Sequence, residues 1–231
     1  MKFLVANWKM NGDVEFAENF LKKINSIKTE NQIVVCPPFP LLYKFKNFSH
    51  FLGAQNCSDR KNGAFTGEVS PLLLKDLGCK YVIIGHSERR RIFNESDEMI
   101  FEKYKTLTEL GINPIICVGE TEKARPEWRD VLSIQLSKFK NDENLSKAII
   151  AYEPVWSIGS GKTPTTSEIH EVLSFIKQTT NSKCPTLYGG SVNIKSISDI
   201  LPIPSVDGVL IGGASLRIEE FSEMIRYAER I

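Results

Sequence analysis

The chain has 231 residues, of which 42% are hydrophobic and 25% are charged, a composition typical of an ordinary globular protein. Its 29 basic and 28 acidic residues leave a net charge of only +1. The sequence therefore lacks the global field that attracts nucleic acids or anionic membranes, and we expect neither as a partner. Recognition of an anion would have to be local.

The five cysteines are scattered along the chain without a CxxC pair. An odd number at irregular spacing favours neither a disulfide framework nor a zinc site. Cys36 and Cys117 lie within apolar runs, where a free thiol behaves as a small hydrophobe. The first apolar run is too short for a signal peptide, and none approaches the length of a membrane span. These features predict a cytoplasmic protein with no metal site.

Short apolar runs rich in β-branched residues recur at a steady interval. They cover residues 3–6, 33–36, 51–54, 81–84, 114–118, 148–152, 185–188 and 207–211. None alternates polar with apolar residues, so each predicts a strand that is buried on both faces, as in a parallel sheet.

Between these runs, apolar residues recur with the period of a helix. The stripes consist of Phe16, Phe20, Ile24 and Ile27; Met99, Tyr104, Leu107 and Leu110; Ile169, Val172, Leu173 and Ile176; and Leu216, Phe221, Ile225 and Ala228. Thr165 and Glu168 precede the third stripe at the spacing of a capping box. Gly78 and Gly111 each follow a helical segment, where glycine is a common helix terminator.

Eight strands that alternate with helical segments predict an α/β protein with a single-domain (β/α)8 barrel over residues 1–231. The competing arrangement is a doubly wound open sheet, which normally carries a glycine-rich loop after its first strand. The residues after the first run, from Asn7 to Gly12, contain no GxGxxG motif. The barrel is therefore favoured.

In such a barrel the functional groups gather where the strands end. Ionisable and amide side chains follow three of the strands, at Asn7 and Lys9, at His86 and at Glu153, whereas Gly189-Gly190-Ser191 and Gly212-Gly213-Ala214-Ser215 follow the last two. Glycine lets backbone N–H groups approach a phosphate closely. The pattern predicts catalysis on one side of the barrel mouth and a phosphate site on the other, although paired glycines also form simple tight turns.

His86 and Glu153 each have a plainer interpretation. A lone histidine is often a structural hydrogen-bonding residue, and a carboxylate at the end of an apolar strand is often half of an ion pair. His86, however, begins a helical turn, whose amides disfavour the charged ring and leave a neutral hydrogen-bond donor. Glu153 is followed by a segment with the composition of a lid.

That segment has a stiff start, a small-residue middle and a stiff end. The predicted lid consists of Pro154, Val155, Trp156, Ser157, Ile158, Gly159, Ser160, Gly161, Lys162 and Thr163. Its Gly-Ser-Gly-Lys-Thr stretch is similar to the end of a nucleotide-binding P-loop. The P-loop is rejected because Trp156 stands where that motif requires its first glycine.

With these residues placed, the chain resembles the triosephosphate isomerase family from end to end. The resemblance lies in Asn7-Trp8-Lys9-Met10-Asn11, Gly53-Ala54-Gln55-Asn56-Cys57, Gly63-Ala64-Phe65-Thr66-Gly67-Glu68, and the stretches 85–90, 117–120, 152–156, 188–192 and 208–216. It implies a TIM barrel that interconverts dihydroxyacetone phosphate and glyceraldehyde 3-phosphate, in glycolysis and gluconeogenesis, without a metal or cofactor.

The resemblance also implies residue roles. Glu153 would move a proton between neighbouring carbons, a neutral His86 would donate to the enediolate oxygens, and Lys9 would stabilise the negative charge. Asn7 would help to orient the substrate and His86. The backbone at Gly159, Ser191, Gly212 and Gly213 would hold the phosphate. Glu88 would either lie beside His86 or pair with Arg89 or Arg90, and these two alternatives stay open.

A homodimer is implied as well. The polar stretch 57–68, with Phe65 and Thr66 near its end, would reach into a partner subunit near Met10. Read alone, it is a solvated loop. The chain departs from the family pattern at Ser157, Ser160 and Pro164 in the lid, and its outer helices, such as that at 41–48, are reduced. These departures bear on lid motion and stability.

Two other functions compete with isomerisation. A catalytically silent barrel that binds phosphorylated metabolites would need neither Glu153 nor Lys9. Another barrel enzyme on a phosphorylated substrate, such as an indole-pathway isomerase or an aldolase, is possible in principle. An aldolase would need a Schiff-base lysine within a strand, and none of the predicted strands has an interior lysine.

Overall fold

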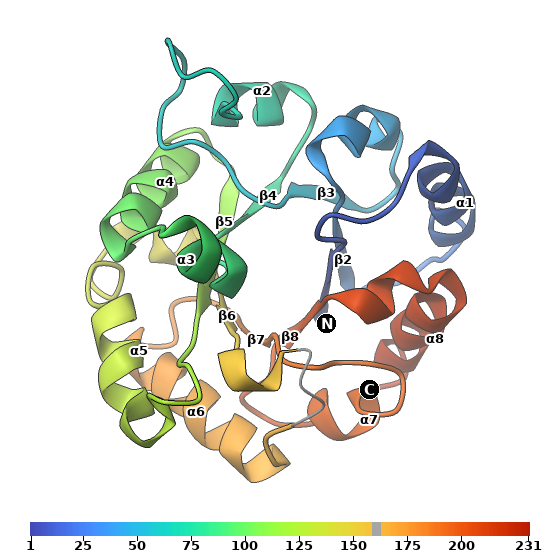
Figure 1. Cartoon of the computed structure of the whole chain (residues 1–231). Helices are drawn as coiled ribbons and strands as arrows, with labels where there is room; N and C mark the ends of the chain where they lie inside the picture. The colour runs from blue at the N-terminus through green and yellow to red at the C-terminus, as the bar shows by residue number, and fades with distance from the viewer. Residues whose placement is uncertain (159–162) are drawn as a thin grey trace.

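The computed structural model describes residues 1–158 and 163–231 and shows a closed barrel of eight parallel strands in sequence order. The strands are β1 Phe3–Asn7, β2 Gln32–Cys36, β3 Phe51–Ala54, β4 Tyr81–Ile84, β5 Asn113–Val118, β6 Ile149–Tyr152, β7 Thr186–Tyr188 and β8 Gly208–Ile211. The barrel closes where β1 pairs with β8, and the helices surround it (Figure 1). The predicted barrel is confirmed, and each predicted strand is correct to within one residue at either end.

The α-helices lie outside the barrel. They are α1 Val14–Ile24, α2 Pro71–Asp76, α3 Ser87–Phe93, α4 Asp97–Glu109, α5 Trp128–Leu136, α6 Thr166–Thr179, α7 Ile197–Ile200 and α8 Ile218–Ala228. Between β2 and β3 the connection is instead a 3-10 helix, Phe39–Phe45. Prolines at 37, 38 and 40 remove backbone donors at its start, which disfavours a longer α-helix. The reduced outer helix expected here is confirmed.

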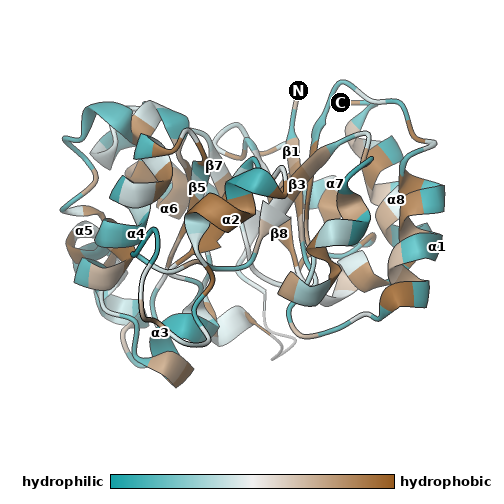
Figure 2. Ribbon diagram, turned by 90° about the horizontal axis from the view of Figure 1, so that it is seen from above, coloured by the Kyte–Doolittle hydropathy of each residue, from teal (hydrophilic) through white to brown (hydrophobic). Residues whose placement is uncertain are grey.

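The barrel has two apolar layers because successive strand residues point to opposite faces. Leu4 and Ala6 belong to the large core between strands and helices, whereas Val5, Cys36 and Cys117 belong to a smaller cluster of strand residues. Both layers are closed to solvent, which explains why the strand sequences do not alternate. Figure 2 shows mostly hydrophobic strands enclosed by helices that carry both hydrophobic and hydrophilic residues.

The helix ends follow the sequence signals. Thr165 and Glu168 form the predicted capping box at the start of α6, and Gly78 and Gly111 adopt positive φ angles of 87° and 72° just past α2 and α4. One predicted stripe was wrong in part, because Met99 is 47% exposed. Ile100 takes its place in the core, since it lies four residues before Tyr104 and therefore on the same helix face.

All five cysteines are free and buried, as predicted for Cys36 and Cys117. Within the described parts of the chain, no helix is long and apolar enough to cross a membrane.

Candidate active site

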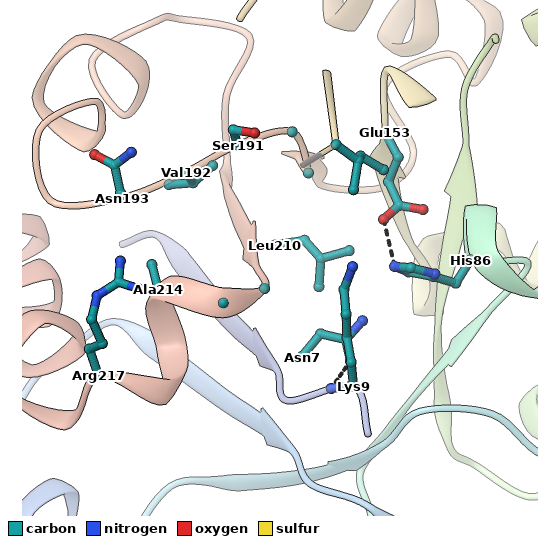
Figure 3. A pocket seen from close by; sticks show the side chains of 15 residues that line it. Asn7, Lys9, His86, Glu153, Ser191, Val192, Asn193, Leu210, Ala214 and Arg217 are labelled. Carbon is teal, nitrogen blue, oxygen red and sulfur yellow. Dashed lines mark hydrogen bonds and ion pairs between the residues drawn. The ribbon is translucent and has the colours of Figure 1, made fainter. Parts of the chain in front are cut away.

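A cavity of about 290 Å³ opens at the carboxyl ends of the strands. Its lining includes seven of the predicted catalytic and substrate-binding residues, namely Asn7, Lys9, His86, Glu153, Ser191, Gly212 and Gly213. In Figure 3, His86 and Glu153 point toward one another, Lys9 and Asn7 lie beside them, and Ser191 and Arg217 lie toward the other end. The barrel thus brings together residues that are dispersed over the whole sequence.

The start of the chain presents Lys9 through a strained turn. Trp8 is fully buried and anchors the backbone after β1, and Lys9 then adopts a positive φ of 53°. The Asn7 side chain accepts a hydrogen bond from the Lys9 amide at 3.0 Å, and Gln55 Nε2 donates to the Lys9 carbonyl at 2.8 Å. A non-glycine residue in this conformation needs such support, and strain of this kind gathers at functional sites.

Glu88 lies near both Lys9 and His86. It pairs with Lys9, with 2.7 Å between Nζ and Oε1, and its other oxygen is 3.6 Å from His86 Nδ1. Arg89 and Arg90 pair instead with Glu95 and Asp97. Of the two open alternatives for Glu88, the geometry favours the carboxylate near His86.

His86 is positioned as the N-cap of α3, and only 5% of it is exposed. Its Nδ1 accepts a hydrogen bond from the Glu88 amide at 3.1 Å. In the neutral ring the proton is therefore on Nε2, which lies 3.0 Å from Glu153 Oε1. Because Nε2 faces the cavity, the ring is oriented to donate from that atom.

Glu153 is 2% exposed and directly follows β6. Its Oε2 accepts a hydrogen bond from the Ser87 amide at 3.0 Å. Two glycines make room for it. A Cβ on Gly119 would stand 1.9 Å from the Glu153 carbonyl oxygen, and a Cβ on Gly189 would stand 3.0 Å from its Cγ. Its position therefore depends on close packing as well as on hydrogen bonds.

The two buried groups shift one another's pKa. Burial by itself lowers the pKa of His86, but the Glu153 carboxylate raises that pKa above its ordinary value. Burial raises the pKa of Glu153, whereas His86 and the Ser87 amide lower it below its ordinary value. The structure therefore shows Glu153 as a carboxylate whose basicity is reduced by its present partners.

The opposite end of the cavity is lined by backbone and small side chains, together with Arg217 and Asn193. Gly212 follows β8, and Gly213 begins a short 3-10 helix, Gly213–Leu216. A Cβ on Gly213 would meet nothing within 4 Å, so its backbone faces open space. Ser191 lines the same end, where its Oγ donates to the Ser157 carbonyl at 2.7 Å. This end has the open, small-residue surface that suits a phosphate.

The first part of the predicted lid forms a 3-10 turn, Val155–Ser157, after Pro154. It is anchored on Glu120, whose Oε1 accepts hydrogen bonds from Trp156 Nε1 at 2.7 Å and from the Tyr152 hydroxyl at 3.0 Å. Ile158 reaches the cavity lining. Gly159, Ser160, Gly161 and Lys162 lie outside the described residues, and with them the phosphate contact predicted at Gly159. Thr163 lies beyond the cavity, against α6 and α7.

The three residues predicted at a subunit interface lie on the surface. Met10 is 95% exposed and Phe65 is 47% exposed, and Thr66 is also exposed. None of them lines the cavity. Among the described residues, no group of three or more His, Cys, Asp or Glu could hold a metal ion.

Several residues of the site were not predicted. Arg217 and Asn193 line the glycine-rich end of the cavity, and Glu120 anchors the lid turn from a position 1% exposed. Arg217 had a signal, because it follows the Gly-Gly-Ala-Ser-Leu stretch directly. Glu120 had a weaker one, as an acidic residue just past the fifth strand.

The sequence matches the family model described as triosephosphate isomerase over residues 2–228. A protein of Carboxydothermus hydrogenoformans named triosephosphate isomerase is 43% identical, with 97% of each chain covered. Proteins with the same name from Endomicrobium trichonymphae and Mycoplasma mobile are 42% and 41% identical. The first match covers 98% of each chain, and the second covers 97% of this chain and 99% of that protein.

Proposed function

The chain belongs to the triosephosphate isomerase family, and we propose that Glu153, His86 and Lys9 carry out its reaction on triose phosphates. The reaction interconverts dihydroxyacetone phosphate and glyceraldehyde 3-phosphate, a step of glycolysis and gluconeogenesis. The observation that carries the assignment is the contact between Glu153 and His86 Nε2 at 3.0 Å, both nearly fully buried, in a cavity that Lys9 also lines.

The reaction requires Glu153 to exchange partners. The carboxylate turns from His86 toward the substrate and removes a proton from the carbon next to the carbonyl. The C–H electron pair forms a carbon–carbon double bond as the carbonyl π electrons move to oxygen, which gives an enediolate. The hydroxyl proton passes to that oxygen, and the same carboxyl group returns its proton to the neighbouring carbon, so that the carbonyl group forms on the first carbon. A positioned base of this kind contributes about 10² to 10⁴ in rate.

The exchange of partners raises the pKa of Glu153 and lowers the pKa of His86, and both changes favour the reaction. Away from His86 and the Ser87 amide, Glu153 stays buried but loses the groups that lower its pKa, so it becomes a stronger base. His86 loses the anion that raises its pKa. Burial and the amide at Nδ1 then favour a neutral ring that donates from Nε2.

Lys9 and His86 supply the stabilisation of the oxyanion. The ammonium of Lys9 is close to Gly212, since a Cβ there would stand 3.5 Å from Lys9 Cε. It therefore lies between the titratable end and the glycine-rich end of the cavity. We propose that Lys9 stabilises the negative charge that develops on the enediolate. Loss of one such donor lowers the rate by a factor on the order of 10² to 10³. The Asn7 side chain supports Lys9 by accepting a hydrogen bond from the Lys9 backbone amide. This chemistry needs neither a metal nor a cofactor.

The phosphate is assigned to the end of the cavity formed by Ser191, Gly212 and Gly213. The segment that starts at Pro154 is proposed to act as a lid over it, with Gly159 adding a backbone contact. An enediolate next to a phosphate ester would lose phosphate in water, so the lid must exclude solvent during the reaction. Its described start, fixed on Glu120, provides one anchored end.

A coupled isomerase assay on the purified chain and on Glu153→Gln tests the assignment. The variant keeps the shape of the side chain but removes the base, so kcat is expected to fall by about 10² to 10⁴-fold while inorganic phosphate still binds. Glu95→Gln is the control, since Glu95 is equally buried but pairs with Lys103 outside the cavity. Near-wild-type turnover in Glu153→Gln would exclude Glu153 as the base. A wild-type chain that binds phosphate without turnover would favour the silent-barrel alternative.

We propose further that two copies of the chain associate. The segment between β3 and α2 projects from the barrel (Figure 1), and its residues 60–68 are exposed. A polar cavity of about 120 Å³ opens beside Lys9 and Glu88, near the exposed Met10. A partner's Phe65 and Thr66 are proposed to dock there in an isologous dimer. Sedimentation of the wild-type chain and of Thr66→Arg tests this, and a monomeric wild-type chain would refute it.

The proposed location is the cytoplasm. Five free thiols, all buried, suit a reducing compartment. Fractionation of the source cells, followed by detection of the chain in each fraction, tests this proposal. Recovery outside the cytoplasmic fraction would contradict it.

A further inference from the structure

Two buried hydroxyl groups beside the cavity have no hydrogen-bond partner among the described residues. They are Ser157 Oγ and Tyr188 OH, and both side chains are 0% exposed. Buried hydroxyls are nearly always paired, because an unpaired one forfeits the hydrogen bonds that water offers in the unfolded chain. Two unpaired hydroxyls close together indicate that the protein has another conformation in which they are paired.

The two oxygens share the space over Gly190, which lines the cavity. A Cβ on Gly190 would stand 2.1 Å from Tyr188 OH and 3.1 Å from Ser157 Oγ. Burial raises the pKa of Tyr188 to about 12, and the Ser157 hydroxyl lowers it in part. The two oxygens border the same small space, and no hydrogen bond joins them in this structure.

Ser157 is held in its present position through its backbone. Its carbonyl accepts a hydrogen bond from Ser191 Oγ at 2.7 Å, and its amide donates to the Pro154 carbonyl at 2.8 Å. Ser191 lines the end of the cavity assigned to phosphate. A ligand that engages the Ser191 hydroxyl therefore competes with the bond that restrains Ser157.

The Tyr188 hydroxyl has a few polar neighbours besides Ser157. It lines a cavity of about 240 Å³ together with Thr163, Pro164, Thr165 and Ser196, among others. Pro164 has no N–H to donate. The hydroxyls that line this cavity are alternative hydrogen-bond partners for Tyr188. The double-mutant cycle distinguishes them from Ser157.

We propose that Ser157 is a positioning residue whose hydroxyl pairs with that of Tyr188 when the substrate phosphate engages Ser191. Ser191 then releases the Ser157 carbonyl, and Ser157, at the end of the turn that Trp156 anchors on Glu120, moves so that the two hydroxyls meet. Because this turn follows Glu153 and Pro154 directly, the new bond holds Glu153 in its position toward the substrate. The inference rests on the proposed function, since it assigns phosphate to the end of the cavity where Ser191 lies.

The test is a double-mutant cycle with Ser157→Ala, Tyr188→Phe and the combined variant. Each substitution removes one hydroxyl and changes little else. Ser222→Ala and Tyr104→Phe are matched controls. Their hydroxyls are also buried, but they are paired, with Ile218 O at 2.7 Å and with Asp142 Oδ1 at 2.9 Å, and both lie outside the catalytic cavity.

Stability and catalysis are expected to move in opposite directions. Without ligand, Ser157→Ala and Tyr188→Phe should each raise Tm by about 2–4 °C, because an unpaired buried hydroxyl is removed, whereas both controls should lower it. Each of the two single variants should lose about threefold to tenfold in kcat/KM, mainly in kcat. The combined variant should lose no more than the poorer single variant, since the bond can be lost only once.

Inorganic phosphate provides a readout that does not depend on turnover. It should raise the Tm of the wild-type chain more than that of either single variant, again without further loss in the combined variant. A lower Tm for either single variant without ligand, or losses that multiply in the combined variant, would overturn the proposal. A wild-type chain without isomerase activity would overturn only the proposed function, because the response to phosphate still reports the hydroxyl pair.

Discussion

The two ends of the cavity hold their functional atoms in different ways. At the end formed by β1, β4 and β6, the functional atoms belong to side chains, and each is fixed by a specific partner, as His86 is by the Glu88 amide. At the end formed by β7 and β8, glycines and small side chains leave the backbone accessible, and Arg217 and Asn193 line the same end. Figure 3 shows Lys9, His86 and Glu153 gathered at one end, and Ser191, Ala214 and Arg217 toward the other.

The contrast shows what each end tolerates. At the side-chain end a change of one atom alters the chemistry, because the roles proposed for Glu153 and His86 depend on protonation and hydrogen bonding. At the backbone end, added volume matters more than chemistry, because the backbone must remain accessible. Substitutions at the first end should therefore lower turnover, and substitutions at the second should change affinity and packing.

After Glu153→Gln, the largest effect is expected for His86→Gln. Glutamine cannot reproduce a ring that accepts at Nδ1 and donates at Nε2, so kcat should fall by about 10² to 10³-fold with a smaller change in KM. Steady-state kinetics would measure this. His170→Gln is the control, because His170 is exposed on α6 and bonds only to Ser205 among the described residues. A change confined to KM would mean that His86 has a structural role.

An intermediate effect is expected at the backbone end, where two glycines differ. In Gly190→Ala the new Cβ would stand 2.1 Å from Tyr188 OH, whereas in Gly213→Ala it would meet nothing within 4 Å. Gly190→Ala should therefore lower the free energy of unfolding by about 1–3 kcal/mol, and Gly213→Ala should leave it nearly unchanged while raising KM. Urea unfolding and steady-state kinetics test the pair. Equal loss of stability in both variants would contradict this account.

The smallest effect is a difference in pH dependence between two buried glutamates. Burial raises the pKa of Glu120 above its ordinary value, although Trp156 and Tyr152 oppose the shift. Its contribution to stability is therefore fully present below the ordinary value of 4.5 and is lost as the pH rises through the higher folded pKa. Glu153 has a lowered pKa, so its contribution is present above 4.5 and is lost as the pH falls through the lower folded pKa.

Glutamine variants at the two positions separate these contributions. As the pH rises, Glu120→Gln should gain stability relative to the wild-type chain, whereas Glu153→Gln should lose it. Urea unfolding on both sides of pH 4.5 would measure the difference. Trends of the same sign for both variants would show that the two carboxyl groups do not titrate as described.

Much of the fold could be predicted because it depends on local patterns. Unbroken apolar runs predicted strands buried on both faces. Asn7, His86 and Glu153 were predicted at the barrel mouth because they lie at or just after the ends of these runs. The error at Met99 has the same origin. An apolar residue marks a helix but does not by itself decide which face is buried, and Ile100 aligned better with Tyr104.

The partners at the site could not be predicted in the same way. Nothing in the sequence indicated that Glu88 would pair with Lys9 rather than with the adjacent arginines, or that Glu120 would anchor Trp156. These contacts join residues that are far apart in the chain, and their distances are set only when all eight strands close into a barrel.

The sequence by itself determined the order of the elements, the glycines after the last two strands and the identity of the ionisable groups, because these depend on residue type and spacing. The tertiary structure decided which of those groups touch. It placed Glu153 against His86, left the hydroxyls of Ser157 and Tyr188 unpaired over Gly190, and lined the far end of the cavity with Arg217. The physical reason is that periodicity reports burial along one chain segment, whereas hydrogen bonds depend on positions in three dimensions.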